Sequence, residues 1–129
     1  MRISRSAGYG LLAVGYIMKH KDEGIVLSQA ISKEYKIPLE YLLKILQQLV
    51  RANILRSKRG PNGGFSLRKP PKKVTMLQVI EAVDGPMPPQ LDLEDVPKRK
   101  FSGKALQVYK KAVAQTISIF GKTKIADLM

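Results

Sequence analysis

The chain of 129 residues lacks cysteine and tryptophan altogether, and it has a single histidine, His20. Without a thiol it cannot form a disulfide, a thiolate metal site or a cysteine nucleophile. No segment approaches the roughly 18 consecutive apolar residues that a membrane-spanning helix needs. No Ser/His/Asp set, phosphate-binding loop or paired-carboxylate cleft can be recognised either. We therefore expect a protein that is not an enzyme, with no catalytic residue, metal site, cofactor or membrane partner.

Acidic residues are also scarce. Ten Asp and Glu residues stand against 23 Lys and Arg residues, which gives a net charge of +13 and an isoelectric point near 10.1. Such an imbalance favours a polyanionic partner. Charge alone does not separate DNA from ribosomal RNA or an anionic membrane surface, so the choice depends on the motifs.

The segment 27–67 has the pattern of a helix-turn-helix followed by a wing. Ser28 is placed to cap a helix that runs to Tyr35. Pro38 breaks that helix and suits the first position of a second one, which should fade near Asn53. The inward-facing residues of this second helix are expected to be Leu39, Leu42, Leu46, Leu49 and Val50.

The wing is predicted as a strand over 54–58, a turn rich in Gly, Pro and Asn over 59–64, and a returning strand over 65–67. A helix of this kind fits the major groove of double-stranded DNA, and a cationic hairpin beside it reaches the minor groove. The predicted DNA-binding residues are Ser28, Gln29, Glu40, Tyr41, Leu43, Lys44, Lys58, Arg59 and Gly60.

The remaining pattern divides the chain into three parts. Residues 1–84 should form the winged helix-turn-helix domain, with a first helix whose apolar stripe starts at Ala7 and a last helix capped by Thr75. Residues 85–100 form a Pro-rich irregular loop. Residues 101–129 contain a long helix over 102–120 and a short terminal helix that docks back. The predicted fold class is mainly α with a small β-wing.

The long helix carries two apolar stripes, which we interpret as one surface for the chain's own domain and one for a second copy. A homodimer is predicted through the seam with heptad-like spacing, formed by Leu106, Tyr109, Val113, Thr116 and Phe120. The adjacent stripe contains Ala105, Val108, Ala112 and Ile119. The alternative is a monomer in which one wide stripe faces the core.

These motifs together resemble the IscR/NsrR/CymR group of bacterial winged-helix regulators, the Rrf2 family. The resemblance rests on the opening MRISRSAGYG, on IPLEYL at 37–42, on RGPNGGF at 59–65, on VIEAVDG at 79–85 and on IADL at 125–128. It implies a symmetric dimer that binds a pseudo-palindromic operator and controls transcription.

Two departures from that group change the expectation. Many members bind an iron–sulfur cluster through three cysteines in the loop that is 85–100 here, and this chain has none. Cysteine ligation is therefore impossible, and the acidic tip formed by Asp92, Glu94 and Asp95 is expected to be solvated. Leu43 stands where the group often has a glutamate that accepts from cytosine, so the operator should differ.

The sequence therefore predicts a cytoplasmic, homodimeric, sequence-specific DNA-binding transcriptional regulator, a repressor, without an iron–sulfur cluster. One alternative is a winged-helix adaptor that binds another protein. A second alternative keeps the DNA function and adds an effector, a small molecule or a partner protein, bound between the long helix and the winged domain.

Overall fold

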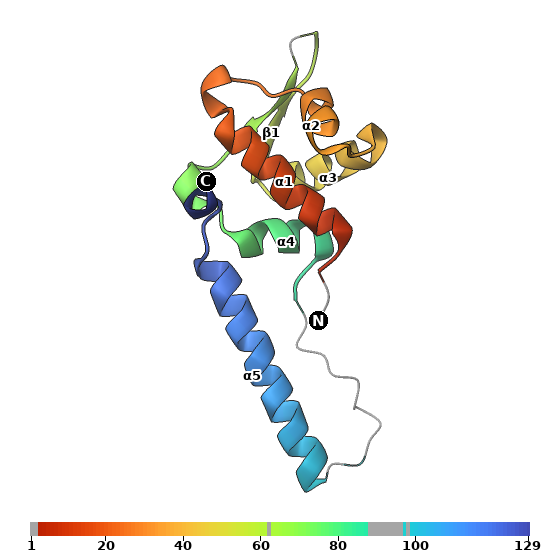
Figure 1. Cartoon of the computed structure of the whole chain (residues 1–129), viewed down its shortest axis with the longest axis vertical. Coiled ribbons are helices and arrows are strands. Elements are labelled where there is room, and N and C mark those ends of the chain that lie inside the picture. Colours follow the sequence, from red (N-terminus) through yellow and green to blue (C-terminus); the bar gives the residue numbers. More distant parts are fainter. Residues whose placement is uncertain (1–2, 62, 88–96, 98) are drawn as a thin grey trace.

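The computed structural model describes residues 3–61, 63–87, 97 and 99–129. These residues form a compact body of helices with a small hairpin, from which one long helix extends (Figure 1). This architecture confirms the predicted fold class. The helices and strands are α1 (Arg5–Lys19), α2 (Ser28–Tyr35), α3 (Leu39–Arg51), β1 (Leu55–Lys58), β2 (Gly64–Leu67), α4 (Met76–Asp84) and α5 (Lys100–Lys122).

Helix α1 lies across the domain and packs on α3 and α4. Its N-cap is Ser4, whose hydroxyl accepts a hydrogen bond from the backbone N–H of Ala7 at 3.0 Å. Gly10 permits the close contact with α4, because a Cβ there would lie 3.2 Å from a methyl group of Val83. The predicted inward stripe of this helix is buried at Ala7 and at Val14 and Met18, two and three turns further along.

The helix-turn-helix forms as predicted, with two shifts of one residue. The N-cap of α2 is Leu27, so Ser28 is the first helical residue and the prediction that Ser28 caps this helix is wrong. Its hydroxyl instead donates to the side-chain oxygen of Gln29 at 3.3 Å. Lys36 ends α2 in the left-handed conformation, with φ 54°. Pro38 is the N-cap of α3 rather than its first residue.

Helix α3 is held by four buried side chains, Leu42, Ile45, Leu46 and Leu49. Leu39 and Val50, which were expected inside, are half-buried, whereas Ile45 was not expected there. The buried face is wider than a single stripe because α3 packs on both α1 and α4. Asn53 follows the helix with φ 63°, which confirms the predicted left-handed ending.

The wing is an antiparallel hairpin in which Leu55 pairs with Leu67 and Lys58 pairs with Gly64. Val26, which precedes α2, bridges to Phe65 through two backbone hydrogen bonds of 2.8 Å. Leu55 and Phe65 are buried, so the base of the hairpin belongs to the core. The strands start one residue later at Leu55 and one residue earlier at Gly64 than predicted.

Helix α4 begins with the predicted cap. The Thr75 hydroxyl accepts from the Gln78 N–H at 3.1 Å, and the Gln78 side chain accepts from the Thr75 N–H at 3.0 Å, which makes a capping box. Val79 and Ile80 are the buried residues of this helix. Gly85 ends it, with φ 82°.

Helix α5 extends beyond the predicted 102–120 at both ends, and only its C-terminal end meets the compact body (Figure 1). After it the chain returns to α4, because Met76 donates to the Thr123 carbonyl at 2.8 Å and Ile125 donates to the Val74 carbonyl at 2.9 Å. A short 3-10 helix, Ile125–Leu128, docks there with Ile125 buried, as predicted. Most of the expected loop 85–100, including Asp92, Glu94 and Asp95, lies outside the described residues.

Candidate nucleic-acid interface

The outward face of α3 is a row of solvent-exposed side chains. Its core face anchors the helix, so the residues between the buried positions must point away from the domain. The exposed residues of this helix are Glu40, Tyr41, Leu43, Lys44, Gln47 and Arg51. All four α3 residues that were predicted to bind DNA are therefore exposed.

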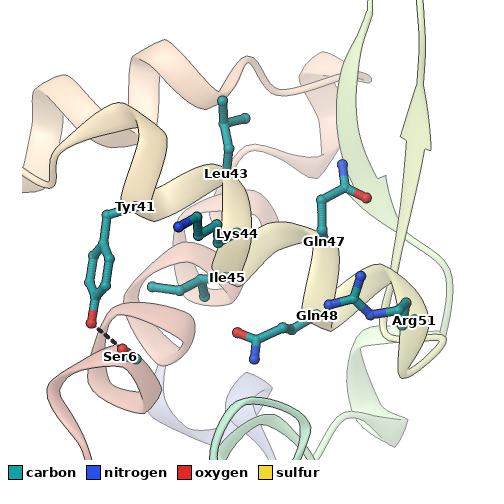
Figure 2. A pocket seen from close by; sticks show the side chains of 8 residues that line it. All are labelled: Ser6, Tyr41, Leu43, Lys44, Ile45, Gln47, Gln48 and Arg51. Atoms are coloured by element: carbon teal, nitrogen blue, oxygen red, sulfur yellow. Dashed lines mark hydrogen bonds between the residues drawn. The ribbon is translucent and has the colours of Figure 1, made fainter.

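Part of this face is a shallow hollow, which we call the helix hollow. Three of the predicted residues, Tyr41, Leu43 and Lys44, lie in it, whereas Glu40 does not. Its lining is Ser6, Tyr41, Leu43, Lys44, Ile45, Gln47, Gln48 and Arg51 (Figure 2). The hollow combines an apolar floor with two cations, Lys44 and Arg51, and the exposed amide of Gln47, and cations and amides are groups that contact phosphates and base edges.

Tyr41 has a structural connection that the sequence did not indicate. Its hydroxyl forms a short hydrogen bond with the Ser6 hydroxyl on α1 (Figure 2). The edge of its ring also meets the ring of Tyr9, with centroids 5.7 Å apart and planes at 86°. Tyr41 thus joins the start of α3 to α1. When the Ser6 hydroxyl is the donor in this bond, the Tyr41 O–H stays available to donate to a DNA phosphate.

A second hollow, the wing hollow, lies between the start of α2, the middle of α3 and the hairpin. It brings together five predicted residues that are distant in sequence, namely Ser28, Gln29, Lys58, Arg59 and Gly60. Gln47 also lines it and is the one residue that this lining shares with the helix hollow. The two hollows are therefore parts of one continuous surface along α3 and the wing.

The start of α2 faces the wing hollow with its backbone. Ser28 is only 8% exposed, so its side chain offers little surface to a ligand. No side chain caps the helix at Leu27. The first backbone N–H groups of an uncapped helix are good donors to an anion, and the helix dipole favours negative charge there. A phosphate contact at Ser28 and Gln29 would therefore use these backbone groups.

The cations of this surface are not neutralised within the part of the chain that the structure describes. Across those residues, no Lys or Arg side chain lies within 4.0 Å of a carboxylate, and the one contact of this kind is made by His20, whose Nε2 lies 4.0 Å from the Glu23 carboxylate. Lys44, Arg51, Lys58 and Arg59 are all exposed. Their positive charge is therefore available to a polyanion.

Gln47 and Arg51 belong to this surface but were not among the predicted site residues. Both lie on the side of α3 opposite its core stripe, at steps of four residues from Leu43. Residues four apart lie on the same side of a helix. This helical phase was the available signal, and it would have added both residues to the site.

Within the single chain, the residues of the predicted dimer seam on α5 are less exposed than the residues of the adjacent apolar stripe. Val113 is 2% exposed and thus already buried in the single chain. The other predicted seam residues, Leu106, Tyr109, Thr116 and Phe120, are half-buried. The exposed apolar residues belong to the adjacent side, with Phe101 at 84%, Val108 at 69% and Ile119 at 63% exposure.

These features define the class of the protein. A helix-turn-helix with an exposed second helix, a cationic hairpin beside it and unneutralised cations on both make a winged-helix protein of the DNA-binding type. Residues 3–129 match the Rrf2 family, described as iron-dependent transcriptional regulators. The chain belongs to this family, whose members are regulators of transcription rather than enzymes.

Individual relatives agree with this assignment. A protein of Aquifex aeolicus, named as an HTH-type transcriptional regulator, is 37% identical over 81 residues, which are 63% of this chain and 56% of that protein. The regulator BadM of Rhodopseudomonas palustris is 39% identical over 80 residues, covering 62% of this chain and 51% of BadM. The matches thus span about half the length of these relatives.

The similarity to solved structures covers nearly the whole chain. The structure of CymR, the global cysteine regulator of B. subtilis, superimposes with a TM-score of 0.82 at 26% identity. The alignment covers 99% of this chain and 95% of CymR. It includes the long C-terminal helix as well as the winged domain.

The iron implied by the family description does not fit the donor groups of this chain as an iron–sulfur cluster. Such clusters are held by cysteine thiolates, and the sequence contains no cysteine. No group of three His, Asp or Glu residues converges anywhere in the described ranges. His20 stacks on Tyr16 with ring centroids 4.1 Å apart, and its Nδ1 lies 2.9 Å from the Tyr16 carbonyl oxygen.

Among the described residues, no helix is both long enough and apolar enough to cross a bilayer.

Proposed function

We propose that this protein is a sequence-specific DNA-binding transcriptional regulator in which α3 enters the major groove and Arg59 on the wing enters the minor groove. The observation that carries the proposal is the continuous surface formed by the helix hollow and the wing hollow. It brings together eight of the nine residues predicted to bind DNA. Its cations can contact phosphates, while the Gln47 amide and Leu43 can contact base edges.

We further propose that the protein acts as a homodimer on a pseudo-palindromic operator. Helix α5 projects from the domain and leaves Val108 and Ile119 exposed. In a two-fold symmetric dimer, this stripe packs against the same stripe of the second copy, and the contact removes both stripes from water. The proposed interface contains the stripe of Val108, Ala112 and Ile119, with Leu106, Tyr109, Thr116 and Phe120 along its edge.

The proposed activity is repression in the bacterial cytoplasm, without an iron–sulfur cluster. Repression requires only that the protein occupy an operator that overlaps a promoter, and the described surface serves that purpose. The absence of thiols leaves a small molecule or a partner protein as the effector. A colourless protein after anaerobic purification would support this proposal, and stoichiometric iron and sulfide would contradict it.

Salt dependence tests the DNA-binding proposal directly. Affinity for a duplex of random sequence should fall linearly on a log–log plot against salt, by about −0.9 per neutralised phosphate. A flat response would contradict the proposal and favour the adaptor alternative. Arg59→Ala should weaken binding to a selected operator by about 1–3 kcal/mol. Lys110→Ala is the control, because it removes one charge from an exposed position on α5.

A further inference from the structure

Two neighbouring glutamines on α3 have different surroundings. Gln48 is half-buried, and its side-chain N–H donates to the Val83 carbonyl at 3.4 Å, which directs it to α4. Gln47 is exposed and makes no hydrogen bond with any other described residue. It lines both hollows, so it lies between the major-groove face of α3 and the wing. Gln47 therefore presents an unengaged amide at the centre of the proposed interface.

The chemistry of a primary amide selects one base edge in the major groove. Its N–H donor and its carbonyl acceptor lie side by side, which matches the N7 acceptor and the N6 donor of adenine. Guanine presents two acceptors, N7 and O6, so the amide oxygen would face another acceptor. A buried polar group without a partner is costly, and the mismatch would reduce affinity.

Leu43 lies one helical turn before Gln47 on the same side. The two side chains extend in the same direction from α3, away from Ser6 (Figure 2). Leu43 is 36% exposed and has no hydrogen-bonding group, so the favourable contact open to it in the major groove is the thymine methyl. Four residues of helix span about 6 Å, which is close to two base-pair steps of about 3.4 Å.

We propose that Leu43 and Gln47 act as a pair that selects A·T base pairs, with Gln47 reading an adenine and Leu43 contacting a thymine methyl about two base pairs away. This inference rests on the proposed DNA-binding function and adds the base identity to it. Each half-site of the operator then carries two A·T pairs at this spacing. Lys44 and Arg51 flank the pair and supply phosphate contacts.

Selection from a library of randomised duplexes tests the inference, using full-length wild type, Gln47→Ala and Gln48→Ala. The wild type should enrich an inverted repeat with an A·T pair at the Gln47 position. Gln47→Ala should lose the preference at that one position in each half-site and bind the wild-type consensus roughly tenfold or more weakly. When that A·T pair is replaced, the wild type should bind no more tightly than Gln47→Ala, because the unpaired amide then gives no advantage. Gln48→Ala should keep every base preference.

The other outcomes distinguish a failure of this inference from a failure of the proposed DNA-binding function. If Gln47→Ala keeps all base preferences, loses affinity equally for all sequences, or loses a preference for G·C, the inference is overturned and DNA binding stands. If the wild type enriches no sequence, the sequence-specific function fails together with the inference. Circular dichroism and urea unfolding of each variant establish that the fold is unchanged, because both glutamines lie outside the buried core of α3.

Discussion

Gly63 occupies the point where the wing turns back on itself. A Cβ at this position would lie 2.3 Å from the Lys58 carbonyl oxygen and 2.9 Å from that of Gly60. Gly64 is equally constrained, because a Cβ there would lie 2.5 Å from the Val26 carbonyl oxygen. The glycines therefore allow the hairpin to close against the strand-like segment before α2, and this closure places Arg59 beside α3.

Substitution of Gly63 tests that constraint. Gly63→Ala should lower the free energy of unfolding by about 1–3 kcal/mol, since the turn must open to admit the methyl group. DNA affinity should fall as the wing moves. Gly103→Ala on α5 is the control: nothing lies near its Cβ position, and alanine in a helix should stabilise it by up to about 1 kcal/mol. If the two substitutions change the free energy of unfolding in urea equally, the steric constraint at Gly63 is contradicted.

Tyr41 has two roles that a pair of substitutions can separate. Tyr41→Phe removes the hydroxyl that bonds Ser6 and that we expect to contact a phosphate, whereas Ser6→Ala removes only the bond between α3 and α1. We therefore expect Tyr41→Phe to weaken DNA binding more than Ser6→Ala, with similar losses of stability of about 1 kcal/mol. If the two variants bind DNA with equal affinity in fluorescence anisotropy, Tyr41 only anchors α3 to α1.

At the scale of elements, Asp84 joins the end of α4 to the start of α1. Its carboxylate accepts from the backbone N–H of Ser4 at 2.9 Å and also from the Ser4 hydroxyl. A carboxylate at the last position of α4 is unfavourable for that helix but favourable at the N-terminus of α1. The contact therefore links the chain just before residues 85–100 to the helix that supports Tyr41.

Removal of this contact should lower the stability of the fold more than removal of the same charge elsewhere on the surface. Asp84→Ala should lower the free energy of unfolding by about 1 kcal/mol, because an exposed but charge-assisted hydrogen bond is lost. Asp22→Ala, at an exposed position in the 3-10 turn after α1, removes the same charge and should have little effect. Identical urea midpoints for the two variants would contradict a structural role for Asp84.

The elements that the sequence predicts well are those bounded by local chemistry. The Thr75 cap and the Asn53 helix ending depend on neighbouring residues, and both are confirmed. The errors arise where contacts cross the chain. Val26 bridges to Phe65, about forty positions away, and this fixes the entry to α2 so that Ser28 falls inside the helix. Ile45 is buried because α1 and α4 both cover α3.

At the scale of the whole molecule, contacts between distant parts of the chain also decide which side of α5 is buried. The sequence shows two apolar stripes, but their spacing does not tell which one the chain's own domain covers. The structure buries Val113 and exposes Val108, which lies on the adjacent side. The exposed positions of the candidate DNA site on α3 and the wing were more predictable, because helical phase and turn residues identify them without any distant contact.

Charge placed on the exposed stripe tests the proposed dimer. Val108→Glu should bring two carboxylates together across the two-fold axis, dissociate the dimer at micromolar concentration and weaken operator binding, with the domain still folded. Val113→Glu should instead destabilise each chain, because it buries a charge. Gln107→Glu adds the same charge about 100° around the helix and is the control. A wild-type monomer by analytical ultracentrifugation would contradict the proposal.

We propose that α3 and the wing together recognise a particular DNA sequence. The most direct measurement selects fragments bound by the wild-type protein from its native genome and compares the affinity of the enriched site with that of a scrambled duplex at the same salt concentration. We expect an inverted repeat bound at least about 10³-fold more tightly than the scrambled sequence. Equal affinity for both duplexes, or no enriched sequence, would contradict sequence-specific recognition by α3 and the wing.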